Sequence, residues 1–299
     1  SRDAEREADR FGLSTLQNAG FDPLGMEAFF ERLQQNNRWY ENASTAYIST
    51  HPMTSERMSD MQNRTRHMSP VTHRDSMDFF LVKARARVLQ ETTYDGWLKV
   101  SKSFENELKR HPAGYSLVAT QYGLSVAYAK MNQKDKALTA IRAAKAASKE
   151  NSVILDKHLA ELTYQVAKTQ AQKDQALALA KSTCNQYPYS GLAASNYVEL
   201  LFQSGKHQEL VDYLRNQSAL SRSNPDYHMY LARSYEALGK KSMAFAATGD
   251  MYALLDNPRA AVYQFELAQK ANDGDFYIMS EIDAKLREQR QKVLDQKKD

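Results

Sequence analysis

Two carboxylates near the start of the chain have a spacing that could serve a metal ion. Glu5 and Asp9 lie four residues apart, which places them on one face of a helix. Their charges would repel each other there unless a cation lay between or above them. Glu5 as a zinc ligand, with Asp9 orienting another ligand, is a chemically sensible pair. On spacing alone, an ordinary solvent-exposed helix explains the pattern better, because such pairs are common.

The flanking sequence predicts the helix that would position this pair. Residues 2–18 carry apolar side chains at roughly helical spacing, among them Phe11 and Leu13. Gly20 follows and fits a left-handed C-cap, because glycine adopts positive φ without steric cost. We therefore expect a first helix that ends just before Gly20.

A second helix is expected directly afterwards. Asp22 and Pro23 combine an N-cap residue with proline at the first helical position. The helix that follows, over residues 24–33, is expected to bury its aromatic residues Phe29 and Phe30.

A polar loop and a third helix complete this segment. The loop covers residues 34–49 and includes Trp39 and Tyr40, and the helix is expected near residues 54–67. A loop of this length usually carries function or is mobile. Trp39 and Tyr40 are therefore interpreted either as a lid or substrate contact, or as residues of a mobile segment.

Three motifs in order resemble those of zinc metallopeptidases of the M48 family. The segment SRDAEREADRFGL, at residues 1–13, resembles the family's second zinc motif, and GFDP at residues 20–23 also matches its pattern. STHPMTSER, at residues 49–57, resembles the family element T-H-P-x-x-x-x-R. Three motifs with similar spacing are far more specific than any one of them.

The resemblance implies roles for four residues. Glu5 would be the third protein ligand of Zn²⁺, and Asp9 would orient a histidine of the first zinc motif. His51 would lie on the loop over the active site, where it could cap or occupy the open position of the zinc. Arg57 would help to anchor that segment. The alternative for His51 is an ordinary His-Pro loop residue.

The first zinc motif of the family is absent from this chain. M48 enzymes need H-E-x-x-H, in which two histidines bind zinc and the glutamate is the general base. None of the seven histidines here is followed by glutamate. Ser1 also reads as helix interior, which fits a processed or truncated start. We therefore expect this chain alone to bind zinc weakly and to cleave nothing, with an upstream segment supplying the missing groups.

The remainder of the chain contains an internal repeat of about 34 residues. Paired helical stretches with small residues at their crossings are typical of tetratricopeptide (TPR) repeats. The units are expected to start near Leu81, Val118, Lys157, Gly191 and Pro225. After Ala244 the spacing shortens to half a repeat, so residues 243–255 could serve two units. A last helix, over residues 276–294, is expected to cap the array.

Together these features predict an all-α protein. The C-terminal portion of a helical metallopeptidase domain would occupy residues 1–72, and a TPR α-solenoid residues 73–299. Only 11 glycines and 7 prolines fit a helical chain, and no run of eighteen apolar residues could span a membrane. The net charge of +4, with basic and acidic residues interspersed, argues against nucleic-acid binding. The single cysteine, Cys184, is expected to be a buried small residue rather than a nucleophile.

Two functions remain open at this point. The first is a zinc endopeptidase or chaperone whose TPR concave face binds outer-membrane β-barrel proteins or their assembly machinery, in periplasmic quality control, as the resemblance implies. The second is a non-enzymatic TPR adaptor or chaperone scaffold. An adaptor has no reason to keep Glu5, Asp9 and His51 in their family context.

Overall fold

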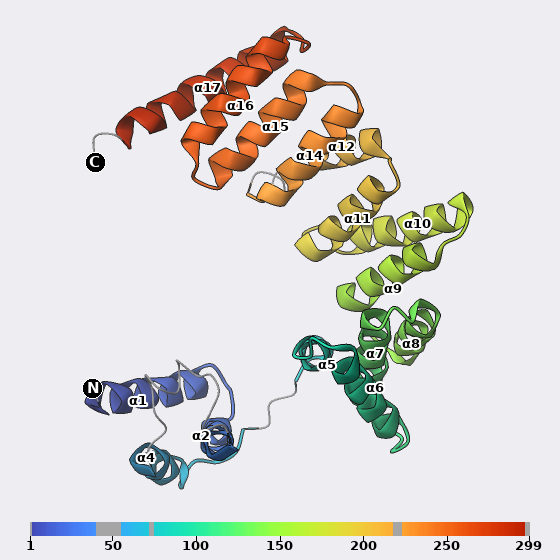
Figure 1. The fold of residues 1–299 in the computed structure, drawn as a ribbon. Helices are drawn as coiled ribbons and strands as arrows, with labels where there is room; N and C mark the ends of the chain where they lie inside the picture. Colours follow the sequence, from blue (N-terminus) through green and yellow to red (C-terminus); the bar gives the residue numbers. More distant parts are fainter. Residues whose placement is uncertain (1, 40–54, 72–74, 218–222, 297–299) are drawn as a thin grey trace. The chain divides into compact units, whose positions relative to one another are not determined.

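The computed structural model describes residues 2–39, 55–71, 75–217 and 223–296, with residues 35–39 described by their backbone alone. Within these ranges the chain is all-α, with fifteen helices and no strand (Figure 1), which confirms the predicted fold class. None of these helices is long and apolar enough to cross a membrane. Contacts divide the chain into two compact units, Ser1–Ser76 and Met77–Asp299.

The first unit, here called the N-terminal unit, contains three helices in its described part. They are α1 (Arg2–Asn18), α2 (Leu24–Trp39) and α4 (Ser55–Thr65). The predicted cap of α1 is confirmed: Gly20 has a φ of 76°, and the backbone N–H groups of Gly20 and Phe21 donate to the carbonyls of Gln17 and Leu16 at 3.0 and 2.9 Å. These two hydrogen bonds satisfy carbonyl groups that have no hydrogen-bond partner within the last turn of the helix.

Two expectations for the N-terminal unit were wrong. The helix α2 continues to Trp39 instead of ending at Leu33, because no glycine or proline interrupts the polar residues that follow. Phe29 is 52% exposed, not buried. The buried core of this unit consists of Leu13, Phe30, Met58 and Met61. Helical spacing groups apolar residues on a face, but it does not establish that another element covers that face.

The second unit, here called the repeat unit, contains twelve helices in its described part. They are α5 (Met77–Leu89), α6 (Tyr94–Leu108), α7 (Gly114–Lys130), α8 (Lys134–Ala147), α9 (Val153–Val166), α10 (Gln170–Gln186), α11 (Gly191–Gln203), α12 (His207–Asn216), α14 (Pro225–Ala237), α15 (Lys241–Leu254), α16 (Pro258–Ala271) and α17 (Phe276–Asp295). Successive helices form hairpins, and each hairpin packs on the next. The first five hairpins begin at or within a few residues of the five predicted repeat starts, with α5, α7, α9, α11 and α14.

A recurring turn joins the two helices of several hairpins. Asn132, Gly205 and Gly239 adopt φ values of 58°, 68° and 74°. In each case the N–H of the next residue donates to the carbonyl five residues earlier, at 2.9–3.0 Å. The same arrangement at Asp256 joins α15 to α16. The helix α15 therefore pairs with both α14 and α16, which confirms the predicted double use of residues 243–255.

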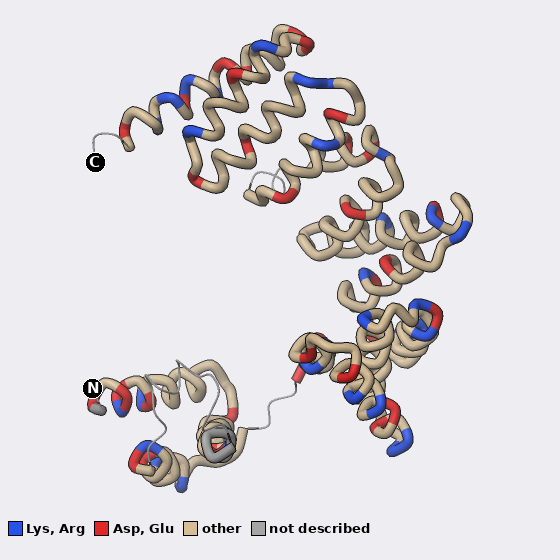
Figure 2. The backbone as a smooth tube through the Cα atoms, viewed as in Figure 1, with Lys and Arg blue, Asp and Glu red and all other residues tan. Residues whose placement is uncertain are grey.

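Small residues allow the hairpin helices to approach closely. Ala137, Ala144, Ala176 and Ala180 are fully buried at 0% exposure, as expected for the crossing positions of TPR repeats. Acidic and basic residues are interspersed along the described helices (Figure 2). The repeat unit is thus stabilised mainly by continuous apolar packing between neighbouring hairpins.

Candidate functional site

The predicted carboxylate pair lies on the first turns of α1. Glu5 is in the first helical turn, where the positive end of the helix dipole favours an acidic side chain. Asp9 is one turn further and is 5% exposed. A buried carboxylate is costly unless a cation or several hydrogen-bond donors satisfy it. The partner of Asp9 therefore decides what this face of α1 can do.

Arg57 supplies that partner from the start of α4. Its Nε and one terminal nitrogen donate to the two carboxylate oxygens of Asp9, each at 2.7 Å. Its other terminal nitrogen lies 3.1 Å from the Oε2 of Glu5. One guanidinium thus bridges both carboxylates, and the bidentate contact with Asp9 is the geometry in which arginine binds carboxylates most strongly.

An aromatic ring supports this bridge from beneath. The guanidinium carbon of Arg57 lies 5.4 Å from the ring centre of Phe30, one of the buried residues of α2. The side chains of Arg57 and Asp9 are only 12% and 7% exposed, so solvent screens their attraction little. The cation–π contact was not predicted, because Phe30 is remote in sequence from both partners.

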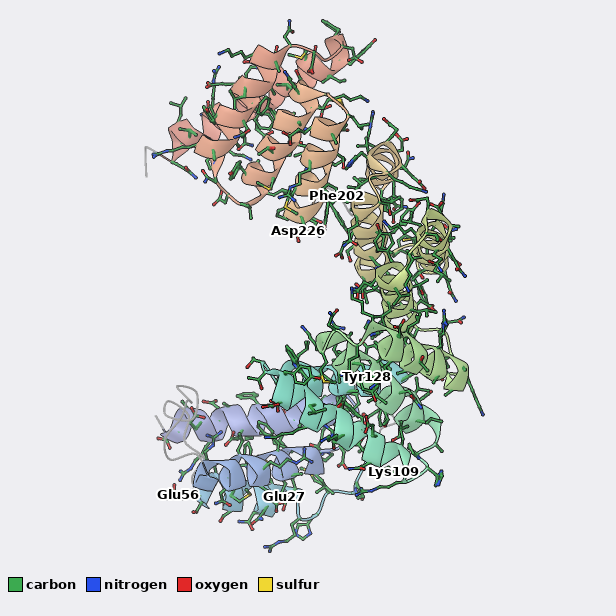
Figure 3. The ribbon with its side chains drawn as sticks, turned by 45° about the vertical axis from the view of Figure 1, so that its right-hand side comes forward. Glu27, Glu56, Lys109, Tyr128, Phe202 and Asp226 are labelled. Atoms are coloured by element: carbon green, nitrogen blue, oxygen red, sulfur yellow. The ribbon has the colours of Figure 1, made fainter. Side chains whose placement is uncertain are left out.

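Two further polar contacts join the helices around the bridge. Arg6 on α1 contacts Glu56 on α4 at 3.1 Å, and both side chains are at least half exposed. On the other side, the hydroxyl of Thr65 donates to Glu27 of α2 at 2.8 Å. Glu27 and Glu56 are marked in Figure 3. These contacts fix α1, α2 and α4 around Arg57, so the carboxylate pair is held in a defined orientation.

The described residues do not by themselves form a zinc site. A catalytic zinc usually takes three protein ligands and a water molecule. Among the residues that the structure describes, no three His, Cys, Asp or Glu side chains come close enough to share an ion. Glu5 fits the role of one oxygen ligand beside an oriented Asp9, and two ligands would have to come from elsewhere. His51 lies outside the described residues.

Cys184 behaves as predicted, as a buried residue of the repeat core. It lies on α10 and is 8% exposed, and burial raises the pKa of its thiol. The hydroxyl of Tyr213 lies 3.5 Å from its sulfur. A thiol with a raised pKa carries little thiolate at neutral pH and is a poor nucleophile.

Comparisons with known proteins agree with the sequence motifs. Residues 1–65 match the model of peptidase family M48. The chain is 27% identical over 258 residues to the β-barrel assembly-enhancing protease of Escherichia coli K12. The aligned region covers 84% of this chain and 49% of that protein. A putative β-barrel assembly-enhancing protease of Vibrio cholerae is 32% identical over 142 residues, covering 46% and 28% of the two chains.

The solved structures that resemble the chain match it only loosely. A mutant of MamA has a TM-score of 0.44 and 17% identity, and covers 60% of this chain and 93% of its own. A tetratricopeptide repeat protein of Parabacteroides merdae has a TM-score of 0.42 and 11% identity, and covers 87% and 98%. The chain spans about half the length of the curated relatives that it matches over most of its residues. Taken with the motifs, the sequence comparisons confirm the predicted resemblance to M48 peptidases, and in this chain the helical hairpins of the repeat unit follow that segment.

Proposed function

We propose that this chain is part of a zinc-dependent endopeptidase that acts in the assembly and quality control of outer-membrane β-barrel proteins in the periplasm. The observation that carries the proposal is the convergence of Glu5, Asp9 and Arg57, which come from two of the family motifs, into one contact. The names of the E. coli and V. cholerae relatives support the process.

Each residue has a definite part in this proposal. Glu5 would be a zinc ligand, and Asp9 would orient a histidine ligand from the H-E-x-x-H segment of the complete protein. Bound zinc would polarise the peptide carbonyl and lower the pKa of its bound water. Arg57 holds both carboxylates in place, and it would help to anchor the segment that carries His51. His51 would cap or occupy the open coordination position of the zinc.

The repeat unit binds the protein that is to be cleaved or assembled. Repeat arrays of this kind present extended surfaces, because each hairpin adds a similar face next to the last. In this proposal the concave face of the array engages an unfolded or partly assembled outer-membrane protein, or the assembly machinery. A chaperone activity would follow from the same binding.

The proposal is tested in the complete protein with Glu5→Gln, and with Glu7→Gln as the matched control. Glu7 lies on the same helix and is exposed. Loss of an outer partner of a metal ligand already costs about 10–100-fold in metal affinity, so loss of a direct ligand should cost at least as much. We expect Glu5→Gln to lose bound zinc and cleavage of an unfolded β-barrel protein, and Glu7→Gln to retain both. Equal zinc content in the two variants would refute the ligand assignment.

The same variants separate the peptidase from the alternative adaptor. An adaptor would bind β-barrel proteins equally well with Glu5→Gln and would show no cleavage in the unsubstituted protein. A peptidase with a repeat platform would retain binding and lose only zinc and cleavage. Zinc content is measured directly on the purified protein, so it does not depend on finding the right substrate.

A further inference from the structure

The first helices of four successive hairpins enclose a small pocket in the repeat unit. It has a volume of about 240 Å³ and lies between α5, α7, α9 and α11. Its apolar wall includes Val82, Ile154 and Leu192. A pocket of this size is smaller than those that take drug-sized ligands, so it suits a single residue of a longer chain.

Charged groups of opposite sign line the pocket, among them Arg85 and Glu161. Arg85 sets the charge of the pocket, because Glu161 is already paired with other groups. Arg85 is exposed, and its guanidinium contacts the hydroxyl of the buried Tyr122 at 3.3 Å. Within the described ranges, no carboxylate lies within ion-pair distance of Arg85, whereas its neighbour Arg87 pairs with Glu107 at 2.7 Å. An arginine beside an apolar wall, without an acidic partner of its own, presents a ready site for an anion.

Glu161 does not neutralise Arg85, because other groups already engage it. Its carboxylate is hydrogen-bonded to Lys157 and lies 3.6 Å from the Nδ1 of His158. Burial alone would raise the pKa of Glu161, but the hydrogen bonds and charges of His158 and Lys157 outweigh it and lower the pKa. The pocket therefore keeps the uncompensated positive charge of Arg85.

Ser125, His158 and Glu161 stand in the order of a hydrolytic triad, but their geometry excludes that role. Ser125 is fully buried, and its Oγ donates to the carbonyl of Ala137 at 2.7 Å. Its Oγ can therefore only accept from the Nε2 of His158, 3.1 Å away. A nucleophilic serine must donate its proton to the histidine instead. The hydrogen bond between Ser125 and His158 instead holds His158 in the wall of the pocket.

We propose that this pocket binds a carboxylate and an adjoining apolar side chain of a polypeptide. Arg85 contacts the carboxylate, with the hydroxyl of Tyr122 beside it, and the wall of Val82, Ile154 and Leu192 covers the apolar side chain. The inference rests on the proposed binding of polypeptides by the repeat unit, and it names the chemistry that one part of that unit recognises. The carboxylate can be a chain terminus or an acidic side chain.

The test uses the 299-residue chain and fluorescein-labelled decapeptides of glycine and serine. One peptide ends in phenylalanine with a free carboxylate, a second carries a C-terminal amide, and a third is an amide with aspartate before the phenylalanine. Fluorescence anisotropy gives the affinities. We expect the second peptide to bind at least about tenfold more weakly than one of the others, the loss of one charge-assisted contact. Which of the two binds identifies the source of the carboxylate.

Two variants locate the binding. Arg85→Gln is expected to lower the affinity about tenfold and to reduce its dependence on salt. Arg142→Gln, an exposed arginine on α8 away from the pocket, is the matched control and should bind as the unsubstituted chain does. Leu192→Trp replaces a partly exposed residue and should block the pocket without disturbing the core.

The outcomes separate this inference from the proposed function. Equal affinities for all three peptides, or equal losses in Arg85→Gln and Arg142→Gln, would refute the pocket. Binding of an unfolded β-barrel protein, measured on the same variants, tests the wider function. If the peptides do not depend on Arg85 but the β-barrel protein binds, the pocket inference falls and the proposed function stands. If the peptides bind through Arg85 and the β-barrel protein does not bind, the pocket stands and the proposed binding of β-barrel proteins by the repeat unit falls.

Discussion

The two units of the molecule obtain their order from different interactions. The N-terminal unit buries four apolar side chains in its core and leaves Phe11, Phe21 and Phe29 about half exposed. The repeat unit has three larger or comparable apolar clusters that continue from hairpin to hairpin. The first unit also buries a charged group, Asp9, close to its core.

This difference teaches what each unit can tolerate. The stabilisation from apolar burial grows with the area buried, so many side chains contribute to the stability of the repeat unit. Loss of one surface charge should therefore change its free energy of unfolding little. In the N-terminal unit, the guanidinium of Arg57 joins α1 to α4 and lies against the ring of Phe30, so a single side chain holds much of this unit together. Packing should therefore dominate the effects of substitutions in one unit, and the charge bridge those in the other.

Phe104→Ala should show the largest effect, in the repeat unit. The ring of Phe104 is 2% exposed and fills the space where a side chain on Gly123 would lie, 2.5 Å from the position of its Cβ. Removal of a buried phenylalanine side chain costs about 3–5 kcal/mol. Chemical denaturation followed by circular dichroism gives the free energy of unfolding. Phe79→Ala, at a ring that is 48% exposed, should change it by less than about 1 kcal/mol.

Arg57→Gln should show the second effect, in the N-terminal unit. It leaves Asp9 buried without its cation, and removal of one partner of a buried pair costs about 3 kcal/mol or more. We expect hydrogen exchange in α1 and α4 to accelerate while the repeat helices keep their protection. Arg64→Gln breaks an exposed pair with Asp60 on the same helix and should cost less than about 1 kcal/mol.

A double substitution sharpens this second prediction. Asp9→Asn removes the charge that Arg57→Gln leaves without a partner, so the two substitutions together should cost less than the sum of their separate effects. Additive costs would show that Arg57 acts through its packing on Phe30 rather than through Asp9.

The sequence predicted those parts of the structure that depend on local chemistry. The cap at Gly20, the turns that end at Lys206 and Lys240, and the shortened spacing after Ala244 all follow from residues that are close together in the chain. The helical spacing of Glu5 and Asp9 likewise gave their common face. Each of these depends on the backbone of one or two adjacent elements.

Other features depend on pairings between distant residues, which spacing does not encode. Arg57 reaches Asp9 across 48 residues, and the roles implied by the family motifs did not pair the two residues. The exposure of Phe29 depends on what covers α2, so helical periodicity predicted it wrongly. The pocket at Arg85 requires four helices to converge, and no local pattern marks its residues.

The smallest effect on the free energy of unfolding is expected at a charged contact in the repeat unit, the carboxylate of Asp273. Asp273 caps the start of α15 from the turn between α16 and α17: its two carboxylate oxygens accept from the backbone N–H groups of Lys241 and Ser242, both at 2.7 Å. Loss of a capping side chain costs about 1 kcal/mol. Asp273→Ala should therefore lower the free energy of unfolding by about that amount. Asp135→Asn, at the exposed start of α8, controls for the helix dipole alone.

The pH dependence of this cap has a definite sign. Hydrogen bonding to the hydroxyl of Ser242, and to backbone N–H groups, outweighs the effect of burial and lowers the pKa of Asp273 below its usual value of 3.8. A lowered pKa in the folded state means that the carboxylate stabilises the fold fully above pH 3.8 and loses this contribution as the pH falls through the folded value. The difference in unfolding free energy between the unsubstituted chain and Asp273→Asn should thus be largest near neutral pH and shrink in acid. A difference that stays constant into acid would show that the neutral side chain caps α15 as well as the carboxylate does.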